Sequence, residues 1–375
     1  MDGGCTSARI APDRRDPGKR TMQALDGITV LDFTTLLPGP LATLMLAEAG
    51  ARVIKIERPG GEDMRRFPPF RGEGAAAVSI PWLLLNRGKT IREIDLKDPS
   101  ARGELEALIA GADVLVEQFR PGVMDRLGLG YETVRALNPR LVYCSISGYG
   151  QTGPRALEAG HDINYQALTG ILALSPGAAG NPTVTPTQTA DIGGGTLPAV
   201  INILLALIRR GRTGQGAHLD IAMADGLFAF AGFALAEAEA SGLAPPPGGD
   251  LLTGGRPRYG LYATADDRLV AVGALEEKFW QAFCDAIALP PAYRDDAATP
   301  EATRAAVADR LRARPAAAWR PIFAAADCCA TLVAPLHEAL ADPHFQARGL
   351  FNGRVEVPGG GELTAIPVPI ARGLR

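Results

Sequence analysis

The chain has 375 residues, of which 47% are hydrophobic and 21% are charged. Both fractions are typical of globular proteins, so they exclude a disordered chain and a fibrous repeat. The length suggests more than one domain. The formal net charge of −3 gives no electrostatic support for a protein that coats nucleic acid.

Several features of the sequence point to the cytoplasm. The most apolar stretch, 197–208, is interrupted by Asn202, which predicts a buried helix that is too short to cross a bilayer. Residues 1–22 carry several cations but no apolar core, so we expect a flexible extension and not a signal peptide. The five cysteines lack a Cys-x-x-Cys pair, which favours a reducing compartment over disulfides or a zinc site.

Residues 23–220 alternate apolar strands with helices. Helices are predicted at 41–48 and from an N-cap at Asp98 to residue 110. Strands are predicted at 28–33, 53–56, 91–96, 113–116 and 141–146. This alternation predicts a large α/β domain with an open, Rossmann-like parallel sheet, in which ligands bind at the carboxyl ends of the strands. An apolar helix at 195–208 follows the sheet.

A second, smaller domain is expected beyond a segment rich in proline and glycine. We predict that residues 221–257 form a linker. Alternating strands within 259–272 and helices at 276–288 and 300–314 then predict an α+β domain over 258–335.

A basic cluster occupies residues 52–97, which contain ten lysines and arginines against six acids. At the ends of strands such a cluster suits a polyphosphate, because arginine binds phosphate through paired hydrogen bonds. A solvated charged surface would give the same pattern. No Gly-x-Gly-x-x-Gly follows the first strand and no P-loop is present, which argues against a nicotinamide oxidoreductase and a P-loop enzyme.

Two further segments carry residues that suit catalysis. His161 and Asp162 lie side by side in G-H-D-I-N-Y, in a chain with four histidines, although a lone histidine is more often structural. Asp191 precedes three glycines at the start of the apolar helix, where an acid is most often an N-cap. The glycines, however, would let ligand atoms approach backbone N–H groups that could stabilise an oxyanion.

Together with a series of shorter motifs, these segments give a sequence that resembles the family III CoA-transferases (the CaiB/BaiF group), and within them the α-methylacyl-CoA racemases. The resemblance covers nearly the whole chain. Each motif is weak alone, but their order is specific. The motifs are G-I-T-V-L-D at 27–32, G-A-R-V-I-K-I-E-R-P at 50–59, N-R-G-K at 86–89, D-L-K at 95–97, F-R-P-G-V at 119–123, G-Y-G-Q-T-G-P at 148–154 and R-T-G-Q-G at 212–216.

This resemblance implies a coenzyme A site at the basic cluster. The CoA would enter as part of the substrate, with no tightly bound cofactor, no metal and no membrane partner. The resemblance also implies an interlocked homodimer, in which residues 336–375 return to the large domain and the active site is shared between two chains. The implied CoA contacts are Arg58, Asn86, Arg87, Lys89, Leu96, Lys97, Arg120 and Arg126.

The resemblance further implies two sets of catalytic residues. Racemases of the family use a histidine and an aspartate that match His161 and Asp191, with an assisting glutamate that matches Glu276. Its transferases use an aspartate nucleophile that matches Asp162. The residues expected to line the substrate pocket are Tyr165, Gly193, Gly194 and Tyr259.

The sequence therefore predicts an enzyme that acts on an acyl-CoA thioester. The favoured reaction epimerises the α-carbon of a 2-methylacyl-CoA, because two groups on opposite faces of an enolate can remove and return the proton. The presence of His161, Asp191 and Glu276 together favours this reaction. The alternative is transfer of CoA between carboxylic acids through an anhydride and a thioester at Asp162. A non-catalytic CoA-binding module is disfavoured, because the acidic residues are present.

Overall fold

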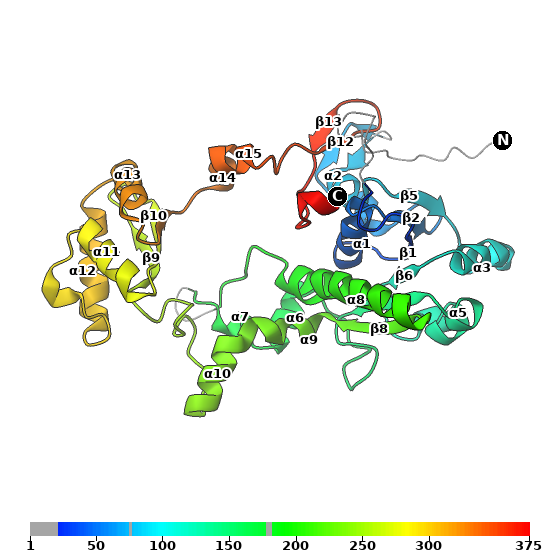
Figure 1. Cartoon of the computed structure of the whole chain (residues 1–375), viewed down its shortest axis with the longest axis horizontal. Helices are drawn as coiled ribbons and strands as arrows, with labels where there is room; N and C mark the ends of the chain where they lie inside the picture. Colours follow the sequence, from blue (N-terminus) through cyan, green and yellow to red (C-terminus); the bar gives the residue numbers. More distant parts are fainter. Residues whose placement is uncertain (1–21, 75–76, 178–181) are drawn as a thin grey trace. The chain divides into compact units, whose positions relative to one another are not determined.

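The computed structural model describes residues 22–74, 77–177 and 182–375, so the predicted flexible extension lies outside the described residues apart from Met22. The described chain divides into two compact units (Figure 1). The first holds the described residues up to Thr169 together with Pro186–Ala229 and Arg348–Arg375. The second holds the described residues of Gly170–Thr185 and Phe230–Ala347.

The first unit is built on a six-stranded parallel sheet with the strand order β5-β2-β1-β6-β7-β8. The order reverses between β1 and β6, as in doubly wound folds, where ligands bind beside the carboxyl ends of the strands. The predicted Rossmann-like α/β sheet is thus confirmed. The strands are β1 (Thr29–Asp32), β2 (Arg52–Glu57), β5 (Thr90–Glu93), β6 (Val114–Glu117), β7 (Val142–Ser147) and β8 (Ala217–Ala222).

Helices cover both faces of this sheet, which is why β6 and β7 are buried along their whole length. The helices α3 (Arg102–Ala110), α4 (Val123–Arg126) and α5 (Tyr131–Leu137) pack with one side of the strands in a single apolar cluster. The helices α1 (Pro38–Glu48) and α8 (Leu197–Thr213) contact the strands but contribute nothing to that cluster, so they cover the other side.

Shorter elements complete the first unit. They are the 3-10 turns η1 (Asp63–Arg66), η3 (Pro99–Ala101) and η8 (Arg372–Leu374), the antiparallel pair β3 (Phe70–Arg71) and β4 (Val78–Ser79), the helices α2 (Ile80–Asn86), α6 (Asp162–Leu168) and α9 (Met223–Leu227), and the antiparallel pair β12 (Arg354–Glu356) and β13 (Glu362–Thr364). The pair β12 and β13 packs with α2 through Val355 and Trp82, so the C-terminal residues belong to this unit.

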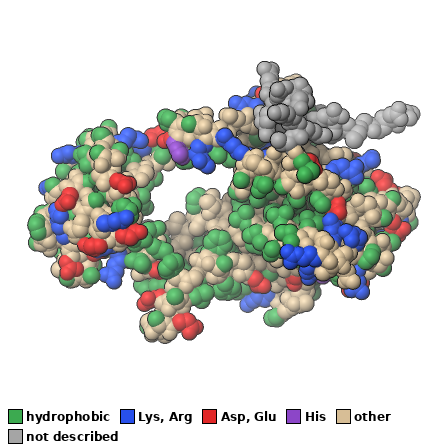
Figure 2. Space-filling model, in the orientation of Figure 1, with side chains coloured by type: hydrophobic (Ala, Val, Ile, Leu, Met, Phe, Trp, Pro, Cys, Tyr) green, Lys and Arg blue, Asp and Glu red, His purple; other side chains and the backbone are tan. Residues whose placement is uncertain are grey.

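The helix α8 continues from a π-helical turn, η5 (Thr189–Thr196), into one helical stretch from Thr189 to Thr213. By length and composition this stretch could cross a membrane, so the prediction that it is too short is wrong. The added turn comes from the glycine-rich segment, whose composition is typical of a loop. Figure 2 shows hydrophobic side chains gathered on the face of the first unit that carries α8. The exposed apolar residues of α8 are Ile201, Leu204, Leu205 and Ile208.

The predicted linker at 221–257 is also wrong in part. It holds the end of β8 and three helical segments, because the proline- and glycine-rich composition begins only beyond Ser241. The strand β8 itself was not predicted, since it is an edge strand whose His218 and Asp220 are exposed. Besides α9, the helical segments are η6 (Phe228–Ala231) and α10 (Gly232–Ser241).

The second unit has a three-stranded antiparallel sheet in the order β11-β10-β9, against which helices pack around Trp280, Phe283 and Trp319. Its strands are β9 (Tyr259–Ala263), β10 (Leu269–Gly273) and β11 (Ala330–Leu332). Its helices, besides α10, are α7 (Ile171–Leu174), α11 (Glu277–Ala286), η7 (Pro291–Tyr293), α12 (Pro300–Arg312), α13 (Ala316–Ala326), α14 (Leu336–Ala341) and α15 (Pro343–Ala347).

Candidate active site

The predicted catalytic histidine lies beyond the carboxyl end of β7. The chain leaves this strand, passes the G-Y-G turn at 148–150 and enters α6 with His161 at the N-cap and Asp162 as the first helical residue. The N–H of His161 donates to Oδ1 of Asn164 at 3.0 Å, which ties the N-cap to the first turn. Because ligands of parallel sheets bind at this edge, the topology places His161 where a substrate is expected.

Tyr165 supports this corner from the protein interior. Its hydroxyl donates to the carbonyl oxygen of Gly160 at 2.6 Å, and its ring lies edge-on to Tyr149 with the centroids 5.2 Å apart. A Cβ on Gly148 or Gly160 would come within 2.6 Å of the Tyr165 ring, so both glycines are required by close packing. Burial, followed by the charge of Asp191, raises the pKa of Tyr165 to about 12, so the phenol stays neutral.

Three hydrogen bonds hold the carboxylate of Asp162. Its Oδ1 accepts the N–H groups of Ala190 at 2.7 Å and of Asp191 at 3.0 Å, and its Oδ2 accepts from Nε2 of Gln166 at 2.5 Å. These bonds join α6 to η5, two segments that are far apart in the sequence. Three of the four predicted catalytic residues, His161, Asp162 and Asp191, are therefore brought into one cluster.

Asp191 lies inside η5 and is half-buried. Burial and the negative charge of Asp162 raise the pKa of Asp191 to about 6, while His161 acts in the opposite direction. The side chain does not cap the helix, because it belongs to the π-helical turn and makes no capping hydrogen bond. Such turns are frequent at functional sites. The arrangement leaves a carboxyl group that can hold or release a proton near neutral pH.

The neighbouring glycines serve the packing of the first unit. A Cβ on Gly194 would lie 2.1 Å from the carbonyl oxygen of Met223 in α9, and one on Gly195 would meet the Met223 side chain at 2.9 Å. Close approach of the protein's own chain explains these two glycines, so an approaching ligand is not needed to explain Gly194. Gly193 is half-buried beside Asp191.

Glu276 and Tyr259 belong to the second unit. Tyr259 begins β9 and pairs with Gly273 at the end of β10, and Glu276 is the exposed N-cap of α11 three residues later. Both residues thus lie at the same end of the small sheet.

Three of the predicted CoA contacts are buried inside the first unit. Nζ of Lys89 donates to Oδ2 of Asp32 at 3.0 Å, to Oδ1 of Asn86 at 2.9 Å and to the carbonyl oxygen of Pro40 at 2.9 Å. An ammonium group has three N–H donors, and all three are used. The Arg87 guanidinium is bound to Glu48, with Nε to Oε1 at 2.9 Å, and to two backbone carbonyls. These contacts assign Asn86, Arg87 and Lys89 to the fold and argue against the predicted contact with CoA.

The cluster around Lys89 is charge-compensated. Lys55, also buried, lies 3.1 Å from Oε1 of Glu62 and donates to the carbonyl oxygen of Thr34 at 2.6 Å. Burial opposes the charged form of Asp32, but Lys55 and Lys89 together hold its pKa below the ordinary value. Burial lowers the pKa of Lys89 to about 8, with Asp32 opposing the shift. The cluster fixes the chain that follows β1.

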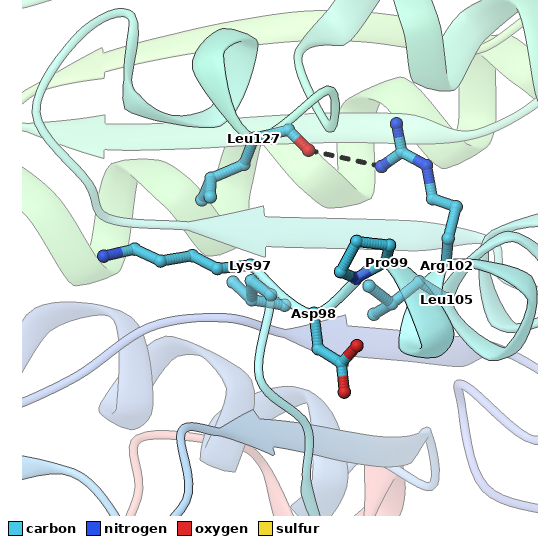
Figure 3. Close-up of a pocket in the computed structure, with 7 residues that line it drawn as sticks. Lys97, Asp98, Pro99, Arg102, Leu105 and Leu127 are labelled. Atoms are coloured by element: carbon cyan, nitrogen blue, oxygen red, sulfur yellow. Dashed lines mark hydrogen bonds between the residues drawn. The ribbon is translucent and has the colours of Figure 1, made fainter.

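The other predicted CoA contacts remain accessible. Arg58, Lys97, Arg120 and Arg126 are exposed, and Leu96 is half-buried. Arg58 is ion-paired with Asp63. One pocket of the first unit has a volume of about 310 Å³, and in it the Arg102 guanidinium donates to the carbonyl oxygen of Leu127 at 3.2 Å. Figure 3 shows this hydrogen bond across the pocket. The residues that line it are Leu96, Lys97, Asp98, Pro99, Arg102, Leu105 and Leu127.

Sequence reasoning missed the wall of this pocket formed by Arg102, Leu105 and Leu127. Their positions follow from the packing of α3 against the segment after α4, and no local motif marks them. Among residues 22–74, 77–177 and 182–375, no group of three or more His, Cys, Asp or Glu side chains gathers in a way that could hold a metal ion.

Comparison with known proteins agrees with this architecture. The chain is 36% identical over 332 residues to the human alpha-methylacyl-CoA racemase, covering 88% of this chain and 82% of that protein. It is 37% identical over 351 residues to the acetyl-CoA:oxalate CoA-transferase of Acetobacter aceti, covering 89% of this chain and 87% of that protein. The crystal structure of a CAIB/BAIF family protein from Brucella suis superposes with a TM-score of 0.80 at 29% identity, covering 93% of this chain and 92% of that one.

The racemase and the transferase are thus similar to this chain to nearly the same degree. Residues 25–372 match CoA-transferase family III, which confirms the resemblance drawn from the motifs. The chain belongs to CoA-transferase family III, and it is an enzyme of the CoA-transferase or racemase type.

Proposed function

We propose that the enzyme epimerises the α-carbon of a 2-methylacyl-CoA thioester by two-base proton transfer. The observation that carries the proposal is the contrast between two neighbouring carboxyl groups. Asp162 is committed to three hydrogen bonds, whereas the pKa of Asp191 is raised to about 6 beside His161. A group whose pKa lies near the working pH is suited to proton transfer.

The bonding of Asp162 supports a positioning role. A carboxylate nucleophile attacks the thioester carbon through a lone pair, and each hydrogen bond to its oxygens lowers its reactivity. Two of the donors are backbone N–H groups of η5, so Asp162 is tied to the segment that carries Asp191. We assign Asp162 the task of holding Asp191 in place.

The proton transfer divides between His161 and Asp191. For one epimer, the neutral imidazole of His161 takes the α-proton, the electron pair moves into the thioester carbonyl, and the carboxylic acid of Asp191 delivers its proton to the opposite face. For the other epimer the roles are reversed. The first-turn N–H groups of α6 have no acceptor within the helix, and those of Asp162 and Ile163 are our candidates to stabilise the enolate oxygen.

Coenzyme A enters as part of the substrate, and we assign no tightly bound cofactor. Lys97 at the pocket of Figure 3 supplies one cationic contact to the CoA phosphates, and the exposed Arg58, Arg120 and Arg126 supply others. The charges of Asp162 and Arg120 both act on the pKa of Tyr165, Asp162 raising it and Arg120 lowering it, which supports a position of the arginine near the reacting end. Binding of the CoA moiety would position the α-carbon between His161 and Asp191.

We further propose that the active enzyme is a homodimer, with interlocked chains as the family resemblance implies. The apolar stripe of α8 at Ile201, Leu205 and Ile208 supports this, since large exposed apolar faces mark association surfaces. In the interlocked dimer that the resemblance implies, Glu276 of one chain would assist His161 of the other. The described cysteines carry free thiols, which is consistent with a cytoplasmic enzyme.

The test is a pure 2-methylacyl-CoA epimer incubated with the enzyme in D₂O and followed by NMR. We expect deuterium at the α-carbon and formation of both epimers. A free carboxylate such as oxalate is then added as a CoA acceptor, because a transferase is among the similar proteins. Transfer of CoA to the acceptor without deuterium at the α-carbon would overturn the proposal in favour of the transferase reaction through Asp162.

A further inference from the structure

Glu117 is a buried acid that the proton transfer does not use. It is the last residue of β6 and is 4% exposed. Its Oε2 accepts the N–H of Phe119 at 2.8 Å, so its carboxylate fixes the turn that leads to Arg120. Glu117 and Arg120 also line a cavity of about 230 Å³ between the sheet and the segment that carries α4 and α5.

A short chain of hydrogen bonds links this carboxylate to an exposed histidine. Ser145 on β7 lies in register with Glu117 and shares a side-chain hydrogen bond with it. Oγ of Ser145 lies 3.1 Å from Nε2 of His218 on the edge strand β8. When Glu117 is ionised, Ser145 donates to it and accepts from His218; when Glu117 is protonated, both bonds can reverse. A proton from solvent therefore has a path to the buried carboxyl.

The surroundings of Glu117 allow its carboxyl group to be either protonated or ionised near neutral pH. Burial raises the pKa of Glu117 to about 7, the hydrogen bonds from Ser145 and Phe119 oppose the shift, and the acids Asp125 and Asp220 add to it. Burial likewise lowers the pKa of His218. The charged or titratable groups around Glu117 are Arg120, Asp125, Tyr131, Glu132, Tyr143, Cys144, His218 and Asp220.

We propose that Glu117 positions the Phe119–Arg120 turn and takes up a proton when an acyl-CoA binds there. This inference rests on the proposed function, in which Arg120 contacts the CoA phosphates. A polyanion placed against the turn disfavours a second negative charge beneath it, so the neutral form of Glu117 is favoured in the complex. Because the complex then holds a proton that the free protein loses above pH 7, CoA must bind more weakly as the pH rises above 7.

The experiment is calorimetry of free CoA binding to the full-length protein near pH 7.5, in two buffers with different ionisation enthalpies. At this pH the 3′-phosphate of CoA, with a second pKa of about 6, stays ionised. The wild type should take up a fraction of one proton, and its Kd should rise about three- to tenfold between pH 6.5 and pH 8.5. In Glu117→Gln, which keeps an acceptor for Phe119, both the proton uptake and the pH dependence should disappear.

The matched control is Glu132→Gln, because Glu132 lines the same cavity but is exposed and makes no bond to the turn. This variant should behave as the wild type. Ser145→Ala removes a donor to Glu117, so the pH of maximal proton uptake should move upward, which provides a second test if Glu117→Gln does not fold. CoA binding without proton uptake, or uptake that persists in Glu117→Gln, overturns this inference alone. Failure of the wild type to bind CoA at any pH overturns the proposed function as well.

Discussion

Two clusters of ionisable groups in the first unit differ in how their charges are compensated. At the end of β1, the buried Asp32 faces two ammonium groups, those of Lys55 on β2 and of Lys89. At the start of α6, Asp162 and Asp191 instead bring two carboxyl groups together beside His161. The first cluster alternates in sign, whereas the second places like charges side by side.

This difference decides what each cluster can do. Opposite charges hold the pKa of Asp32 below its ordinary value, so the group stays ionised and serves the fold. Burial, together with the like charge of Asp162, raises the pKa of Asp191 to about 6, so this carboxyl exchanges its proton near neutral pH. Perturbed groups of the second kind are typical of functional sites.

The largest effect is expected from Asp191→Asn. The amide cannot hold or release the proton, and a positioned acid or base contributes about 10²- to 10⁴-fold, so we expect kcat for epimerisation to fall by that factor. The measurement is the initial rate of epimer formation by NMR. Asp162→Asn is the matched control, since its Oδ1 can still accept the N–H groups of Ala190 and Asp191. Asp162→Asn should keep a substantial part of the epimerisation activity. An equal fall of kcat in both variants would contradict the different roles assigned to Asp162 and Asp191.

Lys89→Met tests the compensated cluster. The variant leaves Asp32 buried with one ammonium partner fewer, and breaking a buried pair in this way costs about 3–5 kcal/mol of unfolding free energy. Urea denaturation followed by circular dichroism measures the loss. If Lys89→Met is as stable as the wild type but binds CoA more weakly, Lys89 contacts CoA and the structural role is contradicted.

Lys97→Met is the exposed counterpart. Lys97 lies at the pocket of Figure 3 and is exposed, so its removal should change the unfolding free energy by less than about 0.5 kcal/mol. Loss of a charged hydrogen bond to phosphate should weaken CoA binding about tenfold. Calorimetry of CoA binding checks the affinity, and an unchanged Kd would remove Lys97 from the proposed site.

The smallest effect concerns stability against pH. Because the pKa of Asp191 is higher in the folded protein, folding retains a proton that the unfolded chain releases as the pH rises from about 4 to about 6. The unfolding free energy of the wild type should therefore fall across this window relative to Asp191→Asn. Since the side chain is only half-buried, we expect a difference of about 1 kcal/mol. Parallel urea titrations at pH 4 and pH 7 measure it, and a rise relative to the variant would contradict the assigned shift.

The sheet could largely be predicted because its strands are local signals. Short runs such as the three residues after Asp113 are apolar, and burial on both faces makes them continuous. The edge strand β8 was not predicted, because its exposed His218 and Asp220 interrupt the apolar run. The π-helical turn was not predicted because T-A-D-I-G-G-G-T has the composition of a loop, and two of its first backbone N–H groups are bound by Asp162, which is distant in the sequence.

The site could be predicted only where a motif and the tertiary structure agree. His161, Asp162 and Asp191 were identified from their motifs, and the structure brings them together. The segment 86–89 carries cations like those at 95–97, and composition does not distinguish them. What separates them is the partner of Lys89, Asp32, which is 57 positions away in the sequence. Only the fold shows that the cations at 86–89 are bound by groups of the protein itself.

The most direct test of the two-base account is α-proton exchange in D₂O by His161→Gln and Asp191→Asn, each given the two pure epimers separately. If the groups act from opposite faces, each variant should exchange the α-proton of one epimer only, the two variants should select opposite epimers, and neither should epimerise efficiently. Exchange of both epimers by either variant, or the same preference in both, would contradict the assignment of His161 and Asp191 as the two bases.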